Sequence, residues 1–166
     1  MGAPDGVRRL WAPWRMAYVG ATRASSGCVF CEALASRDDR SNLVLYRGRH
    51  AYLILNAFPY TSGHLMAVLN RHVGTFDDAT VDELADAMAL ARMATVALAA
   101  EYRPDGFNVG LNVGSAAGAG ISDHLHVHVV PRWSGDSNFM AVVGDVRVLS
   151  ETFDRTYERL HGRLTP

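Results

Sequence analysis

Three histidines stand at every second position in the segment SDHLHVHVVPRW, residues 122–133. This alternation is typical of a β-strand, whose odd and even side chains point to opposite faces, so His124, His126 and His128 are expected to form one row with a spacing of about 6.5 Å. The leucine and valine residues between them indicate that the other face packs on a core. The imidazoles therefore line either a catalytic cleft or a metal site.

A single metal ion cannot be bound by all three imidazoles. Side chains at positions i, i+2 and i+4 of a flat strand span about 13 Å, whereas a ligand nitrogen lies about 2 Å from the ion. At most two of the histidines can share a metal. A neutral imidazole has an ordinary pKa near physiological pH, so it suits nucleophilic attack on phosphorus, and neighbouring imidazoles can donate hydrogen bonds to phosphate oxygens.

The motif Cys28-Val-Phe-Cys31 contains both cysteines of the chain. A structural zinc site is normally four-coordinate, so the metal interpretation needs two further ligands, for which His72 and His124 are candidates. A redox function would place the pair beside a thioredoxin-like βαβ pattern, and the strand-rich residues 42–69 do not supply one. Zinc binding is therefore favoured over redox chemistry and over two inert thiols.

Groups that suit an anionic ligand surround the histidine row. The glycine-rich turn GSAAGAG, residues 114–120, would let backbone N–H groups approach a phosphate closely, although such a stretch is also a common connector. Asn56 and Asn112 stand in or beside predicted strands, where an asparagine is either a turn residue or a hydrogen-bonding partner for a sugar or phosphate. A small phosphorylated molecule is therefore a candidate ligand.

The composition bounds the class of protein. A chain of 166 residues with 49% hydrophobic and 20% charged residues is long enough for one domain that buries about 70% of its unfolded surface. The formal net charge of −1 provides no overall field to attract nucleic acid or an anionic membrane, so neither is an expected partner. No apolar stretch suits a signal peptide or the roughly 20 residues of a membrane span, which indicates a cytoplasmic protein.

The first part of the chain divides into an arm and a meander of strands. Residues 1–27, rich in arginine, tryptophan and proline, are predicted to form an irregular arm that packs on its own domain or on a second subunit. Turn signals within residues 42–70 separate three predicted strands: NLVLYRG, HAYLILN and HLMAVLN. No second-domain boundary follows, so residues 28–166 are expected to form a single domain.

A long helix, two strands and a final helix are predicted next. Thr80 and Glu83 have the spacing of a capping box, and the helix that they open should stop before an Arg-Pro pair. Its expected core stripe consists of Leu84, Met88, Ala91, Thr95 and Leu98. FNVGLNVG, residues 107–114, alternates like a strand that pairs with the histidine strand, and residues 148–163 are predicted to be helical. The fold class is therefore α+β with one largely antiparallel sheet.

Taken together, these motifs resemble the histidine triad (HIT) superfamily. HLHVHVV matches its His-x-His-x-His-x-x signature, in which x is apolar, and the resemblance extends from Cys28 to about Trp133. The runs CVFC, LNAFPYTSGHLMAVLNRH, NVGSAAGAG and HLHVHVVPRW occur in the order and approximate spacing of the family. The resemblance implies a HIT-like α+β fold, a nucleotide substrate and a homodimer or higher homo-oligomer.

The resemblance also implies roles for the histidines. His126 matches the nucleophile that attacks the α-phosphorus of a nucleotide and forms a nucleotidyl-histidine intermediate. His128 matches the residue that contacts phosphate and steadies the nucleophile, and His124 matches a zinc ligand in members with a CxxC motif. The implied zinc site is structural and consists of Cys28, Cys31, His72 and His124. No organic cofactor is expected.

Further positions are implied to bind the substrate. Asn56 stands where the family places an Asp or Asn that binds the ribose hydroxyls. Gly120 lies near the position of a Gln that helps to deliver water in hydrolase members, which argues against simple hydrolysis. The other implied substrate contacts are Asn112, Gly118, Ser122, Trp133 and Asn138.

Two further runs, LWAPWRMAYV and HVVPRWSGDSNFM, resemble a bacterial branch that includes diadenosine tetraphosphate phosphorylases. That branch transfers the adenylyl group from the histidine to inorganic phosphate, giving ADP after ATP has left. The alternatives within the superfamily are a diadenosine polyphosphate hydrolase and a nucleoside phosphoramidase. An alternative outside enzymes is a non-catalytic nucleotide-binding protein.

Overall fold

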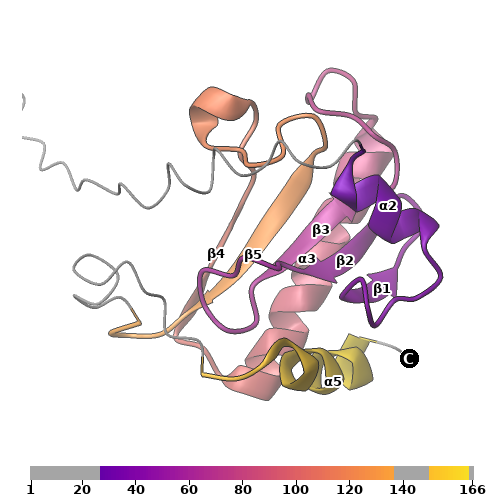
Figure 1. Ribbon diagram of the computed structural model, residues 1–166. Helices are drawn as coiled ribbons and strands as arrows, with labels where there is room; N and C mark the ends of the chain where they lie inside the picture. Colours follow the sequence, from indigo (N-terminus) through magenta and orange to yellow (C-terminus); the bar gives the residue numbers. More distant parts are fainter. Residues whose placement is uncertain (1–26, 137–149, 165–166) are drawn as a thin grey trace, which may run out of the picture.

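The computed structural model describes residues 27–136 and 150–164, and five strands within them form one sheet. The strands are β1 (Val44–Arg47), β2 (Ala51–Leu55), β3 (Leu65–Leu69), β4 (Gly106–Gly110) and β5 (His126–Arg132). Every neighbouring pair is antiparallel, in the order β1-β2-β3-β5-β4 (Figure 1). The predicted α+β class, the three-strand meander and the pairing of β4 with the histidine strand are confirmed.

The histidine strand β5 lies inside the sheet, between β3 and β4. Its register with β3 places His128 beside Met66 and His126 beside Val68, and its register with β4 places Gly110 beside His128. A Cβ atom at Gly110 would have no heavy-atom neighbour within 4 Å. His128 is therefore held by strands on both sides, whereas His126 pairs with β3 alone. The space over Gly110, next to His128, is open.

The strand β4 ends at Gly110, whereas the alternation predicted a strand that continues to residue 114. Gly114 has φ of 80° and ψ of 159°, a backbone conformation that only glycine adopts readily. It turns the chain into the short 3₁₀ helix η1 (Ser115–Ala117). The alternation of residues 111–114 therefore leads into a turn and produces no paired strand.

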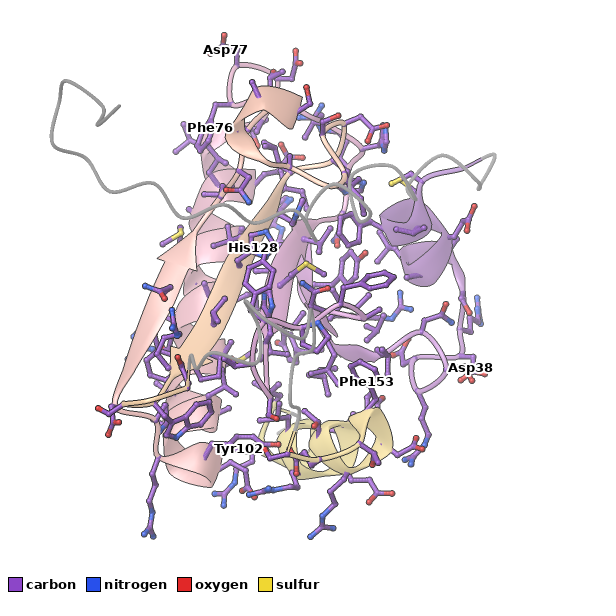
Figure 2. The ribbon with its side chains drawn as sticks, turned by 60° about the vertical axis from the view of Figure 1, so that its left-hand side comes forward. Asp38, Phe76, Asp77, Tyr102, His128 and Phe153 are labelled. Carbon is purple, nitrogen blue, oxygen red and sulfur yellow. The ribbon has the colours of Figure 1, made fainter. Side chains whose placement is uncertain are left out.

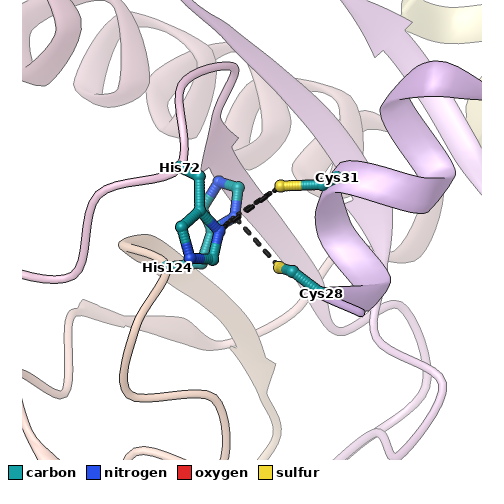
Figure 3. A group of neighbouring side chains, drawn as sticks. All are labelled: Cys28, Cys31, His72 and His124. Carbon is teal, nitrogen blue, oxygen red and sulfur yellow. Dashed lines mark hydrogen bonds between the residues drawn. The ribbon is translucent and has the colours of Figure 1, made fainter. Parts of the chain in front are cut away.

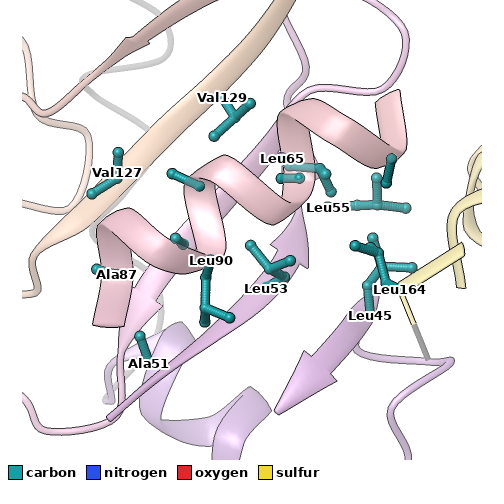
Figure 4. Packing of buried hydrophobic residues seen from close by; sticks show 14 of the residues in the cluster. Leu45, Ala51, Leu53, Leu55, Leu65, Ala87, Leu90, Val127, Val129 and Leu164 are labelled. Carbon is teal, nitrogen blue, oxygen red and sulfur yellow. The ribbon is translucent and has the colours of Figure 1, made fainter. Parts of the chain in front are cut away.

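Two helices cover one face of the sheet. The long helix α3 (Val81–Tyr102) crosses β2, β3 and β5, and α5 (Phe153–Leu164) packs against α3 and β1. Figure 4 shows the apolar side chains that fill the space between α3 and the strands. Members of this main core include Leu45, Leu53, Leu55, Leu65, Leu90, Leu125, Val127, Val129 and Leu164. The apolar face that the sequence predicted for the histidine strand is thus confirmed as core.

The opposite face of the sheet carries the histidines. The short helix α2 (Val29–Ala35) covers part of this face, where its Phe30 joins a second apolar cluster. That cluster consists of Phe30, Ala33, Val44, Tyr52, Ile54, Met66 and Val68. No helix was predicted at these residues, because an element of 7 residues is too short for its periodicity to be distinctive.

The helix α3 begins as the sequence predicted. The hydroxyl of Thr80 accepts the backbone N–H of Glu83, and the Glu83 carboxylate accepts the backbone N–H of Thr80 over 2.8 Å. This reciprocal pair is a capping box, which satisfies two backbone donors at the helix start. The helix ends at Tyr102, where the following Arg103 adopts a left-handed conformation before the proline.

The predicted core stripe of α3 is wrong in part. Ala91 and Leu98 are buried, but Met88 is 51% exposed, and Leu84 and Thr95 are half-buried. The sheet is faced mainly by small side chains, which let the helix approach the strands closely. The buried residues of the helix are Glu83, Ala87, Leu90, Ala91, Ala94, Ala97 and Leu98. In a helix so rich in alanine, hydrophobicity alone does not identify the buried face.

The C-terminal helix begins later than predicted. It starts at Phe153, and the hydroxyl of Thr152 accepts the backbone N–H of Arg155, which is the contact of an N-cap residue. Residues 148–149 of the predicted helix and residues 1–26 of the predicted arm lie outside the described part of the chain. Within residues 27–136 and 150–164, no helix has the length and apolar character needed to cross a bilayer.

Candidate active site and metal centre

The middle histidine, His126, is the first residue of β5 and is buried. Its Nδ1 lies 2.8 Å from the carbonyl oxygen of His124. Because a carbonyl only accepts hydrogen bonds, Nδ1 carries the ring proton and Nε2 keeps its lone pair. Burial lowers the pKa of His126, which favours the neutral ring at pH 7. The geometry therefore presents a neutral imidazole whose Nε2 is chemically suited to nucleophilic attack.

A chain of hydrogen bonds fixes the proton of His128. The backbone N–H of Tyr60 donates to Nδ1 of His64 over 3.1 Å, so Nε2 of His64 carries that ring's proton. This nitrogen lies 3.0 Å from Nδ1 of His128, which accepts the bond and leaves Nε2 of His128 as an N–H donor. Figure 2 shows His128 on the side of the sheet away from α3. His128 can therefore donate a hydrogen bond to an anion.

The residue that the sequence interpretation missed is His64. It directly precedes β3, is 1% exposed, and lies 3.3 Å from the amide nitrogen of Asn56. Asn56, which was predicted to bind ribose, is also buried, and its Oδ1 accepts the backbone N–H of Phe58 over 2.9 Å. The available signal was a single histidine at the head of the apolar run HLMAVLN. Only the pairing of β3 with β5 brings that histidine to His128.

The neutral state of His128 makes stability depend on pH. Burial, assisted by His126, lowers the pKa of His128 from 6.5 to about 4. The unfolded chain therefore binds this proton at higher pH than the folded chain, so stability is lost as the pH falls from about 6.5 to about 4, by at most about 3 kcal/mol. Urea unfolding between pH 4 and pH 8 should show a weaker pH dependence for His128→Asn than for the wild type. Equal pH dependence in both proteins contradicts this prediction.

The glycine-rich turn uses several of its own amides. The backbone N–H groups of three residues donate to carbonyl oxygens within the turn: Ala117, Gly118 and Ala119. Gly118 has φ of 88°, in the left-handed region that favours glycine. These three amides are therefore used within the turn, and donation to a phosphate by other amides of residues 114–122 stays a prediction.

Asn112, Gly120 and Ser122, which were predicted to contact the substrate, lie in or next to this turn. Asn112 and Gly120 are half-buried, and Ser122 is exposed. Asn138 lies outside the described residues. Contact of any of these residues with a substrate stays a prediction.

An ion pair between Arg132 and Asp136 holds the loop that carries Trp133 at the end of β5. The guanidinium of Arg132 donates to both carboxylate oxygens of Asp136, over 2.6 and 2.7 Å. The same carboxylate accepts the backbone N–H of Trp133 over 3.1 Å. Bidentate pairs of this kind fix geometry as well as charge. The ion pair therefore gives the half-buried Trp133 a defined position directly after the histidine strand.

Four metal-ligating side chains converge just before the histidine strand (Figure 3). Nδ1 of His124 lies 3.2 Å from Sγ of Cys28 and 3.6 Å from Sγ of Cys31. Nδ1 of His72 lies 3.4 Å from Sγ of Cys31 and 3.3 Å from Nδ1 of His124. With Zn–S and Zn–N bonds of about 2.3 and 2.05 Å, a tetrahedral zinc site needs about 3.6 Å between sulfur and nitrogen and about 3.3 Å between two nitrogens. The distances fit such a site.

The outer nitrogens of the two ligand histidines also fit metal binding. Nε2 of His124 lies 2.7 Å from the carbonyl oxygen of Leu69, so it carries the proton and Nδ1 is left with its lone pair toward the cluster. Nε2 of His72 lies 3.7 Å from a carboxylate oxygen of Asp123. Backbone carbonyls and carboxylates are the usual outer partners of metal-bound histidines. The donor set predicted from the sequence is therefore brought together in a form that suits zinc.

Gly74 lets the two ligand loops approach each other. A Cβ atom there would lie 2.8 Å from Cα of Asp123 and 2.9 Å from the carbonyl oxygen of Ser122, which is too close for either backbone atom. We expect Gly74→Ala to cost about 1–3 kcal/mol through this clash and to weaken zinc binding, because the clash displaces the neighbours of His72 and His124. Gly106→Ala, with open space around its Cβ, is the matched control. Thermal unfolding and zinc titration check the pair, and equal behaviour of the two variants contradicts the prediction.

Comparisons with known proteins agree with this geometry. A family profile described as HIT domain matches residues 37–135. The chain is 41% identical over 159 residues to the AP-4-A phosphorylase of Mycobacterium tuberculosis, covering 91% of this chain and 81% of that protein.

Solved structures give the same fold. A Zn-bound histidine triad family protein from Mycobacterium smegmatis is 25% identical with a TM-score of 0.67, and the match covers 83% of this chain and 93% of that one. A diadenosine triphosphate hydrolase from Plasmodium falciparum, 19% identical over 76% of each chain, shares the fold with a TM-score of 0.60. The imidazoles of His126 and His128 on β5 agree with these comparisons. The chain therefore belongs to the HIT domain family, as the profile match and the 41% identity show.

Proposed function

We propose that this chain is a nucleotidyltransferase that cleaves diadenosine tetraphosphate with inorganic phosphate to give ATP and ADP. The observation that carries the proposal is the 41% identity to the M. tuberculosis AP-4-A phosphorylase, which extends over 91% of this chain. The neutral imidazole of His126 supports it, because an Nε2 lone pair is the kind of nucleophile that attacks phosphorus.

In the first step His126 attacks the α-phosphorus of the substrate. A bond forms between Nε2 and phosphorus, the bond to the bridging oxygen breaks, and ATP leaves with the electron pair of that bond. The adenylylated ring is positively charged because Nδ1 keeps its proton, and the carbonyl of His124, 2.8 Å from Nδ1, stabilises that charge. The Nε2–H of His128 stabilises negative charge on the phosphate oxygens by donating a hydrogen bond.

In the second step an oxygen of inorganic phosphate attacks the same phosphorus. The bond between phosphorus and Nε2 breaks, its electron pair returns to His126, and ADP leaves. Two in-line displacements restore the neutral ring with its proton still on Nδ1. A fixed tautomer therefore serves both steps, which explains why the site needs no second base beside His126.

A metal held by Cys28, Cys31, His72 and His124 would be structural. As zinc, it would link the start of α2 to the two loops that carry the ligand histidines. The steps at phosphorus use the side chains and backbone around His126 and His128.

The acceptor is tested by supplying diadenosine tetraphosphate with and without inorganic phosphate and identifying the products. The proposal expects ADP and ATP to appear only when phosphate is present. AMP and ATP in the absence of phosphate would instead identify a hydrolase. Hydrolase members carry a glutamine near the position of Gly120, and this chain has no glutamine there. This difference supports phosphate as the acceptor.

A non-catalytic nucleotide-binding role is the alternative outside enzymes. It is separated from the proposal by incubating the protein with substrate that carries a label on the adenylyl group, omitting phosphate, and quenching in alkali, where a phosphoramidate bond survives. A label attached to His126 supports nucleotidyl transfer, and binding without any covalent label supports the alternative.

We also propose that the chain forms a homodimer through the edge of the sheet at β4. Within the described residues β4 pairs with β5 alone, and its Val109 is 44% exposed. Edge strands with exposed apolar side chains are templates for pairing with another chain. Sedimentation should give the mass of a dimer for the wild type, and Val109→Lys should shift the equilibrium toward monomer. A wild type that is monomeric at enzyme-assay concentration contradicts this.

A further inference from the structure

We propose that Phe30 is a positioning residue for the nucleophile, and that the metal centre acts on catalysis through this ring. The inference rests on the proposed function of His126. Phe30 lies between the two ligand cysteines of the CVFC motif, so a metal bound to both sulfurs fixes the backbone on either side of it. Phe30 therefore connects the metal centre with the reacting imidazole.

The ring of Phe30 is packed against two histidines at once. Its centroid lies 5.0 Å from the His126 ring at an interplanar angle of 53°, and 5.4 Å from the His124 ring at 79°. Both distances are in the range of favourable aromatic contacts. Phe30 is only 3% exposed, so almost all of its surface is used by contacts within the protein. Contacts within the protein therefore hold the ring beside the imidazole.

The helix α2 is held to the sheet at the same place. The hydroxyl of Tyr52, on β2, donates to the carbonyl oxygen of Phe30 over 2.8 Å. At the other end of α2, the guanidinium of Arg47 donates to the carbonyl oxygens of Leu34 and Ser36, over 2.7 Å each. The start of the helix has no such bond, since its N-cap residue Cys28 makes no side-chain capping bond. A helix of this length has little stability of its own. Metal binding by Cys28 and Cys31 would therefore fix the start of α2, where Phe30 lies.

The His126 imidazole needs such support because rotation of the ring could turn either of its two nitrogens toward the substrate. One hydrogen bond, from Nδ1 to the carbonyl of His124, selects the orientation with Nε2 outward. Without a neighbour against its flat face, the ring can rotate about its side-chain bonds and turn that lone pair away from the substrate. The Phe30 ring, at 5.0 Å and 53°, limits this rotation together with the His128 ring, at 4.9 Å and 74°. His124 contributes a second link, because the residue whose carbonyl orients His126 is itself one of the four candidate metal ligands.

The inference is tested in the zinc-loaded full chain with Phe30→Leu and Phe30→Ala. Four quantities are measured for each variant: zinc per chain, the tautomer of His126 from ¹⁵N NMR of the imidazole at pH 8, kcat, and the Kd of a non-cleavable diadenosine polyphosphate. Val44→Ala is the control, because Val44 belongs to the same apolar cluster but lies on β1, which β2 and β3 separate from β5. Phe30→Leu keeps most of the buried volume, so it serves if Phe30→Ala does not fold.

We expect both Phe30 variants to retain one zinc ion per chain, to lose the uniform Nδ1–H tautomer of His126, and to lose about 10- to 100-fold in kcat, with Kd changed by less than about 3-fold. Val44→Ala should keep the wild-type tautomer. The inference is overturned if the Phe30 variants also keep the wild-type tautomer and kcat, or if the whole loss is in Kd, which would make Phe30 part of the base pocket.

Removal of zinc from the wild type completes the test. With a chelator, the His126 signals should change in the same way as in Phe30→Ala, and an unchanged tautomer in the folded metal-free protein overturns the link to the metal. The NMR result does not depend on turnover. If the wild type fails to cleave diadenosine tetraphosphate while the tautomer still shifts, the proposed function fails and the positioning role of Phe30 stands.

Discussion

His126→Ala is expected to abolish cleavage of diadenosine tetraphosphate, with a loss in kcat of about 10⁴-fold or more. The nucleophile forms the bond to phosphorus, so removing it removes both steps, whereas loss of a group that only stabilises charge costs less. Because His126 is not among the four metal-ligating residues, the variant should keep its zinc. Measurements of kcat, of zinc content and of the labelled adenylyl-protein check the prediction together.

The control for this variant is His50→Ala. His50 is half-buried on the loop between β1 and β2, and its hydrogen bonds to Asp86 and Asn70 use its backbone, which alanine retains. The control should cleave the substrate at a rate within about 3-fold of the wild type. Activity near that of the wild type in folded His126→Ala would refute the assignment of the nucleophile.

Cys31→Ala is expected to lose zinc and to be strongly destabilised. Removing one of four ligands leaves an incomplete site, so the stabilisation that metal binding adds to the folded state is lost. With free zinc at 100 to 1,000 times its Kd, that stabilisation is about 2.7–4.1 kcal/mol, which corresponds to a fall in Tm of about 5–16 °C. Calorimetry with and without a chelator provides the measurement.

The matched control is Glu32→Ala, which changes the exposed neighbour of Cys31 on the same helix. Glu32→Ala should keep one zinc ion per chain and should lose stability on chelation, as the wild type does. Cys31→Ala should not respond to the chelator, because it has no zinc to lose. A wild type whose Tm is the same with zinc and with chelator shows that the cluster adds no stability through metal.

The candidate site was predictable where the signal in the sequence was local. The period of two in HLHVHVV identifies a strand with its histidines on one face, and the structure places Val127 and Val129 on the core side as that pattern requires. The capping box at Thr80 is likewise a short-range contact between residues three apart. His72 and His124 were candidates to complete the CxxC motif from the residue types alone, and the family resemblance then implied the full set of four, whose members are far apart in the sequence.

What the sequence left open depends on contacts between distant elements. Nothing near His64 indicates that it supports His128, because the two residues meet only through the pairing of β3 with β5. Phe30 looks like an ordinary core residue until α2 is placed over the histidines. The exposed Met88 shows the same limit for α3, whose buried face is decided by which side chains are small enough for the sheet.

The position of β5 inside the sheet has a consequence for how the protein is made. The meander β1-β2-β3 is complete at residue 69, but the strand that pairs with β3 begins only at residue 126. During synthesis the backbone groups of β3 that bond to β5 therefore stay without that partner until residues 126–132 have left the ribosome. The Cys28 and His124 ligands are 96 positions apart, so a metal that binds both closes this long loop only at that late stage. The proposed nucleophile and the candidate metal centre are then completed together, when this one strand pairs with β3.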